Sequence, residues 1–121
     1  MVGAACSKKS GSEGGGTITI NSEKANNHGT KDFSGKSSAD VEMGSFYFEP
    51  TVIKGSAGQT LQITFKNETS ALHNFTLAGK DMGDVQPGKD GTFSVTFPQS
   101  GIVEFHCKYH QSNGMVGELS A

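Results

Sequence analysis

The 121-residue sequence predicts an all-β fold, an antiparallel β-sandwich. Apolar and polar residues alternate over several short runs, such as Phe93, Val95 and Phe97, and this is the pattern of strands buried on one face. Turn-forming residues separate the runs, for example at 86–91 and 98–101. The sequence shows no helical periodicity from Val41 onward. These three observations together favour short strands packed in two layers.

The first 39 residues are mostly polar. Residues 17–20 alternate Thr and Ile and predict a short strand. Residues 21–39 contain Phe33 as their one large apolar side chain, and they predict a long surface loop that is either packed by Phe33 or mobile.

The predicted strands follow in order from Val41. Phe46 and Phe48 alternate around Tyr47, and residues 61–66 alternate in the same way. Further strands are expected over 72–77, 93–97, 102–107 and 115–119. A short helical turn is expected between residues 78 and 86.

Composition bounds the function. The chain has room for one domain, with 33% apolar residues, 17 Gly and a net charge of −2. Residues 1–39 hold five Lys and three acidic residues, whereas residues 40–121 hold five Lys and nine acidic residues. Because the predicted sandwich is mildly acidic, we do not expect nucleic acid as a partner.

The most informative segment lies near the C-terminus, where Cys107, His110 and Met115 fall within nine residues. One Cys, two His and a weakly bound Met form the ligand set of a blue-copper electron-transfer centre. Thiolate and thioether favour Cu(I) and imidazole suits Cu(II), so the mixed set strongly prefers neither oxidation state. The segment therefore predicts three of the four ligands.

The second histidine must come from His28, His73 or His106. His73 shares a predicted strand face with the apolar Phe75 and Leu77, and a buried imidazole needs a polar partner or a metal. His106 is expected to point outward beside Glu104, and His28 lies in a polar loop. His73 is therefore the predicted ligand, with Asn74 beside it placed to support the site.

Strand alternation agrees with this choice. Cys107 shares a face with Val103 and Phe105, and Met115 shares a face with Leu119. One inward ligand from each of three strands, together with His110 from the intervening loop, can converge at one end of a sandwich.

The run 105–117 and the pair His73-Asn74 resemble the copper-binding segments of the cupredoxin family, in its plastocyanin- and pseudoazurin-like branch. The resemblance covers roughly residues 40–121 and rests on the Cys-x2-His-x4-Met spacing. It implies a Greek-key sandwich of about seven to eight strands, with one copper ion bound by His73, Cys107, His110 and Met115. This sequence departs from plastocyanin at Lys108-Tyr109, where Ser-Pro is usual, and at His106, which replaces an aromatic residue.

The resemblance also implies the function, a single-electron carrier between redox partners outside the cytoplasm. We expect a monomer that meets a donor and an acceptor of the cytochrome or oxidase type, with docking around His110. Tyr109, Gly114 and Met82 are expected to line that surface, and Lys108 to add a charge beside it. The alternative function is a module for copper storage or delivery, with His106 as a transient ligand. No enzymatic activity is expected, because no open coordination position or second His cluster is evident.

The N-terminal residues suggest export. Residues 2–6 followed by a Gly/Ser/Lys run resemble the end of a bacterial lipoprotein signal peptide, although its apolar segment is absent. We therefore expect residues 1–16 to be a signal remnant and flexible tether, and residues 17–121 to be the domain. Lipid on Cys6 would anchor a bacterial or archaeal protein to the membrane outside the cytoplasm. The alternative is a remnant of cloning with an incidental cysteine.

Overall fold

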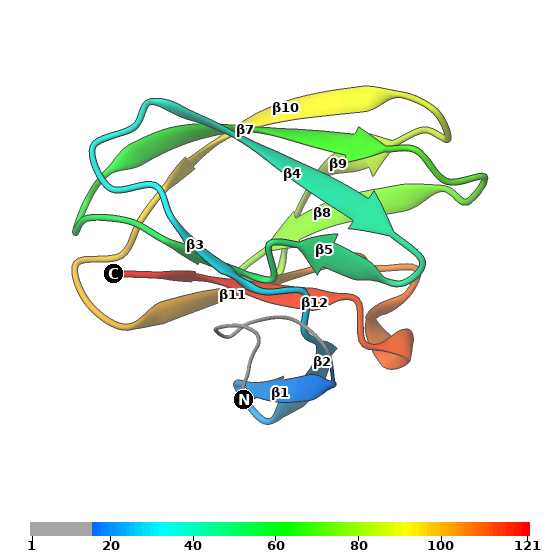
Figure 1. Ribbon diagram of the computed structural model, residues 1–121, viewed down its shortest axis with the longest axis horizontal. Coiled ribbons are helices and arrows are strands. Elements are labelled where there is room, and N and C mark those ends of the chain that lie inside the picture. Colours follow the sequence, from blue (N-terminus) through cyan, green and yellow to red (C-terminus); the bar gives the residue numbers. More distant parts are fainter. Residues whose placement is uncertain (1–15) are drawn as a thin grey trace, which may run out of the picture.

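The computed structural model describes residues 16–121, which form two facing β-sheets and a small outer hairpin (Figure 1). The first sheet has the strand order β10 (Asp90–Thr96), β7 (Thr60–Asn67), β4 (Ser38–Gly44) and β5 (Tyr47–Glu49). The second has the order β3 (Thr30–Asp32), β6 (Val52–Lys54), β12 (Val116–Ser120), β11 (Ile102–His106), β8 (His73–Leu77) and β9 (Lys80–Val85). The hairpin consists of β1 (Thr17–Ile20) and β2 (Glu23–Asn26), and the 3-10 helix η1 spans Gln111–Asn113.

The core between the two sheets is rich in phenylalanine. Four fully buried rings come from both sheets: Phe48, Phe65, Phe75 and Phe105. The Phe65 and Phe75 centroids lie 4.5 Å apart, and Phe48 meets Phe105 edge-on at 4.9 Å. Aromatic pairs at this spacing stabilise a core beyond their area burial, by about 0.5–1.5 kcal/mol each. The alternation that predicted an all-β sandwich therefore corresponds to real inward faces.

Strand direction differs from the prediction. The pairs β4–β7, β6–β12 and β3–β6 are parallel, so the sandwich is mixed and not purely antiparallel. The parallel pairs arise where the chain crosses from one sheet to the other between neighbouring strands, which a tight hairpin does not do. Hydrophobic alternation specifies which face is buried and carries no information about direction.

Residues 16–121 form twelve strands, where about seven to eight were expected. Several are only three residues long, because the segment from β4 to β6 is interrupted twice, once before β5 and once at Pro50. Proline has no N–H to donate to a sheet and so ends a strand. The remaining additional strands are β2 and β3 in the N-terminal region and β9 after β8.

The predicted strand over residues 17–20 is confirmed as β1, but residues 21–39 are not a long loop. They form β2, β3 and the start of β4. Asn21 and Ser22 both have positive φ, 49° and 69°, and make the two-residue turn that a tight hairpin requires. Phe33 is buried in the main core, as the first of the two alternatives expected.

No helical turn forms over residues 78–86, and that expectation is wrong. Ala78 and Gly79 make a tight turn with positive φ, 50° and 81°, that joins β8 to β9 as a hairpin. The polar composition of β9 reflects its position at the sheet edge, where few side chains are buried. Within residues 16–121, no helix is long and apolar enough to cross a membrane. The expected signal remnant with Cys6 lies outside the described residues, except for Gly16.

Candidate metal centre

Three of the predicted ligands meet at one end of the sandwich. The Cys107 Sγ lies 3.4 Å from His110 Nδ1 and 3.9 Å from His73 Nδ1. Within residues 16–121 these are the only His, Cys, Asp or Glu side chains whose donor atoms form such a group, all within 4.8 Å of one another. His73 and Cys107 are fully buried, whereas His110 is partly exposed.

Met115, the fourth predicted ligand, is fully buried in the same core cluster as Cys107. Its backbone ties it to both neighbours: the Cys107 N–H donates to Met115 O at 3.1 Å, and the Met115 N–H donates to His110 O at 3.2 Å. Gly114 makes this return possible because it adopts φ 90° at the end of η1, a conformation that favours glycine.

Hydrogen bonds hold the His73 ring in one orientation. Its Nε2 lies 3.2 Å from the Thr69 hydroxyl, which itself donates to Asn67 Oδ1 at 2.6 Å. A hydroxyl that donates its proton to Asn67 must accept from His73, so the His73 proton sits on Nε2. The lone pair of Nδ1 then faces Cys107 and is available to a metal.

Thr69 and Asn67 were not identified from the sequence. The buried Asn67 side chain also donates to Ala71 O and Val85 O, so it shapes the loop that carries Thr69 to His73. The available signal was the Asn-x-Thr spacing, which is typical of a side-chain-stabilised turn. Nothing local to that turn indicates which side chain it will contact.

Burial keeps both imidazoles neutral. The pKa of His73 is lowered from 6.5 to about 4, mainly by burial and to a smaller extent by repulsion from His110. Burial also lowers the pKa of His110. A neutral imidazole is the form that binds metals, so the two rings are ready as ligands near neutral pH.

The Cys107 thiol experiences opposing influences. Burial raises its pKa, while backbone N–H groups of Tyr109, Asn74 and His110 lower it by hydrogen bonding to the sulfur. Metal coordination deprotonates a thiol outright, and these N–H groups then stabilise the thiolate.

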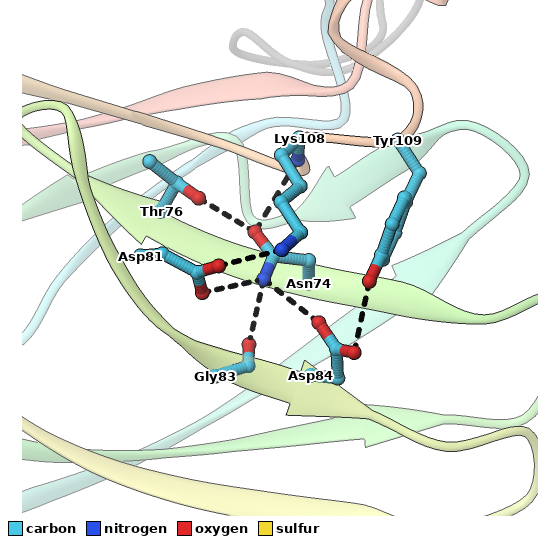
Figure 2. Close-up of polar contacts among 7 residues, drawn as sticks. All are labelled: Asn74, Thr76, Asp81, Gly83, Asp84, Lys108 and Tyr109. Atoms are coloured by element: carbon cyan, nitrogen blue, oxygen red, sulfur yellow. Dashed lines mark hydrogen bonds and ion pairs between the residues drawn. The ribbon is translucent and has the colours of Figure 1, made fainter.

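The Asn74 side chain joins the ligand loop to the β8–β9 hairpin (Figure 2). Its Oδ1 accepts from the Lys108 N–H at 3.3 Å and from the Thr76 hydroxyl at 2.6 Å. Its Nδ2 donates to Asp81 Oδ1, Gly83 O and Asp84 Oδ1, at 2.9, 3.0 and 3.0 Å. Asn74 thus fixes the residue that follows Cys107, in agreement with the supporting role expected for it.

Lys108 and Tyr109, which depart from plastocyanin, contact the same hairpin. Lys108 Nζ pairs with Asp81 at 2.6 Å, and the Tyr109 hydroxyl donates to Asp84 at 2.9 Å (Figure 2). The Lys108 hydrogen bond lowers the pKa of Asp81. Lys108, which was expected to add a charge beside the docking surface, is thus paired with an acidic side chain. Tyr109 remains 43% exposed beside His110.

The surface of His110 is covered on one side by Phe46, whose ring stacks on it with centroids 4.4 Å apart at 29°. Tyr109 approaches it from another side, edge-on at 6.4 Å. Phe46 was predicted only as a strand residue. Its contact with His110 depends on how the β4–β5 connection lies against the ligand loop.

His28 and His106 remain outside the cluster, as expected. His28 stacks on Tyr47 with centroids 3.5 Å apart. His106 Nδ1 lies 2.7 Å from Glu104 Oε2. The Glu104 and His106 side chains face away from the core. Even so, Glu104 is buried and His106 is half-buried, because the hairpin β1–β2 covers this outer face of the sheet. Burial and contact with Glu23 raise the pKa of Glu104.

The donor set fits copper. A thiolate, a thioether and two imidazole nitrogens combine soft and borderline donors, which suit copper in both of its oxidation states. Structural zinc sites also use Cys and His. Their fourth ligand is another thiolate, imidazole or carboxylate, not a thioether. A thioether ligand from the fully buried Met115 would therefore distinguish this site from a zinc site.

A family model described as a cupredoxin-like domain matches residues 7–120. The plastocyanin of Sambucus nigra is 33% identical over 92 residues, covering 65% of this chain and 91% of that protein. Plastocyanin B'/B'' of Nicotiana tabacum is 34% identical over 90 residues, covering 64% of this chain and 89% of that protein.

Solved structures agree in fold. Auracyanin A, a "blue" copper protein of Chloroflexus aurantiacus, superposes with a TM-score of 0.60 at 19% identity, covering 69% of this chain and 96% of that one. The oxidised plastocyanin of Dryopteris crassirhizoma superposes with a TM-score of 0.52 at 25% identity, covering 68% and 98%. Fold, clustered ligands and family match together show that the chain belongs to the cupredoxin-like family.

Proposed function

We propose that this protein is a type 1 copper protein that carries single electrons between redox partners, with copper held by His73, Cys107, His110 and Met115. The observation that carries the proposal is the grouping of one donor atom each from His73, Cys107 and His110, all within 4.8 Å of one another, at one end of the sandwich. Bound copper would supply the one-electron couple.

The contribution of the chain is a preformed, dry environment. His73, Cys107 and Met115 are fully buried, and Asn74 and Thr69 hold the ligand segments by hydrogen bonds. Because these contacts are made by the protein itself, the ligands have little freedom to rearrange when the metal changes charge. Small rearrangement favours fast electron transfer.

The route for electrons is the partly exposed edge of His110. Phe46 and Tyr109 flank it and provide aromatic surface for docking. Redox encounters bury small interfaces, below about 1,200 Å², so a limited patch of this kind suffices. The proposed partners are a protein donor and a protein acceptor of the cytochrome or oxidase type, met by a monomer.

The proposed location is outside the cytoplasm. Its support is the lipoprotein-like run ending at Cys6, and a lipid on Cys6 would hold the domain at a membrane surface.

The relatives named plastocyanin and the structure titled a "blue" copper protein support a carrier rather than an enzyme.

Spectroscopy of the copper form tests the proposal. Protein loaded with Cu(II) should show an intense visible absorption band and a narrow copper hyperfine splitting in EPR, both from the Cu–thiolate bond. Cys107→Ser should abolish the band. The matched control is His28→Gln, which removes an imidazole outside the cluster and should leave both signals unchanged. A band that survives in Cys107→Ser would contradict the assignment.

The same sample distinguishes electron transfer from copper storage or delivery. A carrier should exchange electrons rapidly between its Cu(I) and Cu(II) forms and lose copper slowly to a chelator. Slow loss is expected because His73 and Cys107 have no solvent-exposed surface. Rapid copper loss with slow electron exchange would favour delivery.

A further inference from the structure

The hairpin β1–β2 lies outside the sandwich and packs on the strand that follows Met115 (Figure 1). Ile20 and Ala25 from the hairpin form a second small apolar cluster with Val116, and all three side chains are buried. The hairpin is therefore a packed part of the domain, adjacent to the ligand loop.

Asn26, the last residue of β2, joins the hairpin to two other segments. Its Nδ2 donates to Phe46 O at 2.8 Å and to Asn113 O at 2.9 Å. A carboxamide has two N–H donors, so one side chain satisfies both carbonyls. Its backbone N–H donates to Gly114 O at 2.9 Å.

The two segments held by Asn26 are those that surround His110. Phe46 stacks its ring on the imidazole. The Asn113 N–H donates to His110 O at 2.9 Å, and Gly114 leads directly into Met115. Asn26 thus connects the residue whose ring covers His110 to the turn between His110 and Met115.

The fit between hairpin and loop is close. A Cβ added at Gly114 would lie 2.8 Å from Asn26 Nδ2 and 2.9 Å from Asn26 Cγ, so only glycine leaves room for Asn26 at this distance. At the other end of η1, the Gln111 side chain donates to Glu23 Oε1 on the same strand. The hairpin therefore contacts η1 at its first residue and just past its last.

We propose that Asn26 is a positioning residue of the metal centre, which holds the His110–Met115 turn and the Phe46 ring in their ligand-binding arrangement before metal binds. The inference rests on the proposed function in that it takes His110 and Met115 as copper ligands. It assigns the N-terminal hairpin a role in the site that none of the four ligands reveals.

The test uses Asn26→Asp, which keeps the size of the side chain and removes both N–H donors. Asn27→Asp is the matched control: it adds the same charge one residue away, and the Gly29 N–H that donates to Asn27 Oδ1 at 3.0 Å can still donate to a carboxylate. In metal-free protein, amide hydrogen exchange at residues 113–115 should be at least about tenfold faster in Asn26→Asp than in Asn27→Asp.

The copper form provides the second readout. Asn26→Asp should change the EPR hyperfine splitting and the reduction potential relative to Asn27→Asp, because both variants carry the same added charge but only Asn26→Asp loses the two donors and places a carboxylate against the Phe46 and Asn113 carbonyls. Equal exchange rates in the two variants, or identical EPR spectra, would overturn the proposal. If Asn26→Asp does not fold, Asn26→Ser, which is too short to reach both carbonyls, replaces it and is compared with Asn27→Ser.

Failure of the proposed function would be visible separately. If wild-type protein shows no copper spectrum, the copper assignment fails, and exchange in the metal-free protein still decides whether Asn26 holds the turn.

Discussion

Replacing Thr69 with Val should destabilise the metal-free protein, chiefly because the buried His73 side chain loses the hydroxyl that accepts from its ring. Valine has nearly the shape of threonine but cannot accept the His73 Nε2–H, which lies 3.2 Å from the Thr69 hydroxyl. Since His73 is fully buried, its N–H would lose its partner, at a cost of about 1–3 kcal/mol. Thr69 is only half-buried, so water can replace part of the bond, and we expect a loss of about 1–2 kcal/mol.

The second bond of the Thr69 hydroxyl adds little to this loss. It donates to Asn67 Oδ1 at 2.6 Å, but that oxygen also accepts from the Thr69 backbone N–H at 3.0 Å and keeps this partner in the variant. The hydroxyl also accepts from the Ala71 N–H at 3.2 Å, so the loss comes from the His73 and Ala71 N–H groups together. In the copper form, loss of a group that orients a ligand lowers metal affinity by about 10–100-fold.

Urea unfolding of metal-free protein measures the free energy of unfolding. Thr69→Ser, which restores the hydroxyl, should recover most of the loss. Thr64→Val is the matched control, because its hydroxyl contacts Thr92 at the surface, and it should change the free energy by less than about 0.5 kcal/mol. If Thr69→Val is as stable as Thr69→Ser, the reasoning that Thr69 holds the His73 proton on Nε2 is refuted.

Two further predictions concern the strands and turns around the site. Burial raises the pKa of Glu118 above its usual 4.5, so the contribution of Glu118 to the free energy of unfolding should be largest below pH 4.5 and fall as pH rises through the raised value. Glu118→Gln should remove this contribution, so thermal melts of the variant and of the wild type should diverge in their pH dependence between about pH 4 and about pH 8. An unchanged pH profile would contradict it. Gly114→Ala should cost about 1–3 kcal/mol in urea unfolding, because φ is 90° and the added Cβ would lie 2.8 Å from Asn26 Nδ2. Gly88→Ala is the control, because Gly88 has a similar φ of 72° and open space around it. An equal loss of stability in both variants would refute a steric clash between the Cβ at position 114 and Asn26.

The sequence was sufficient to predict the side chains that cluster in the structure, because much of their arrangement is local. Cys107, His110 and Met115 are close along the chain, and their spacing matches a turn that one glycine closes. The period of two along a strand placed His73 and Cys107 on inward faces, where the structure also places them. The pairing of β11 with β8 then brings the segment that carries His73 beside the strand that leads to Cys107.

The same rules failed at Glu104, for a physical reason. It alternates outward from the core as predicted, yet it is buried, because a hairpin more than 70 residues earlier in the chain covers that face. Outward and exposed are equivalent only where nothing packs on the outside of a sheet. The polar composition of residues 21–39 concealed the strand that does so.

The sequence by itself determined the all-β class, the family and the residues that make up the candidate metal centre, because periodicity and ligand spacing are properties of short segments. Only the tertiary structure decided the strand directions, the Thr69 contact that sets the His73 tautomer, the pairing of Lys108 with Asp81, and the hold of Asn26 on the His110 turn. Each of these joins side chains or strands from different segments. A hydrogen bond needs a partner within about 3 Å, and which partner arrives there depends on how the whole chain packs.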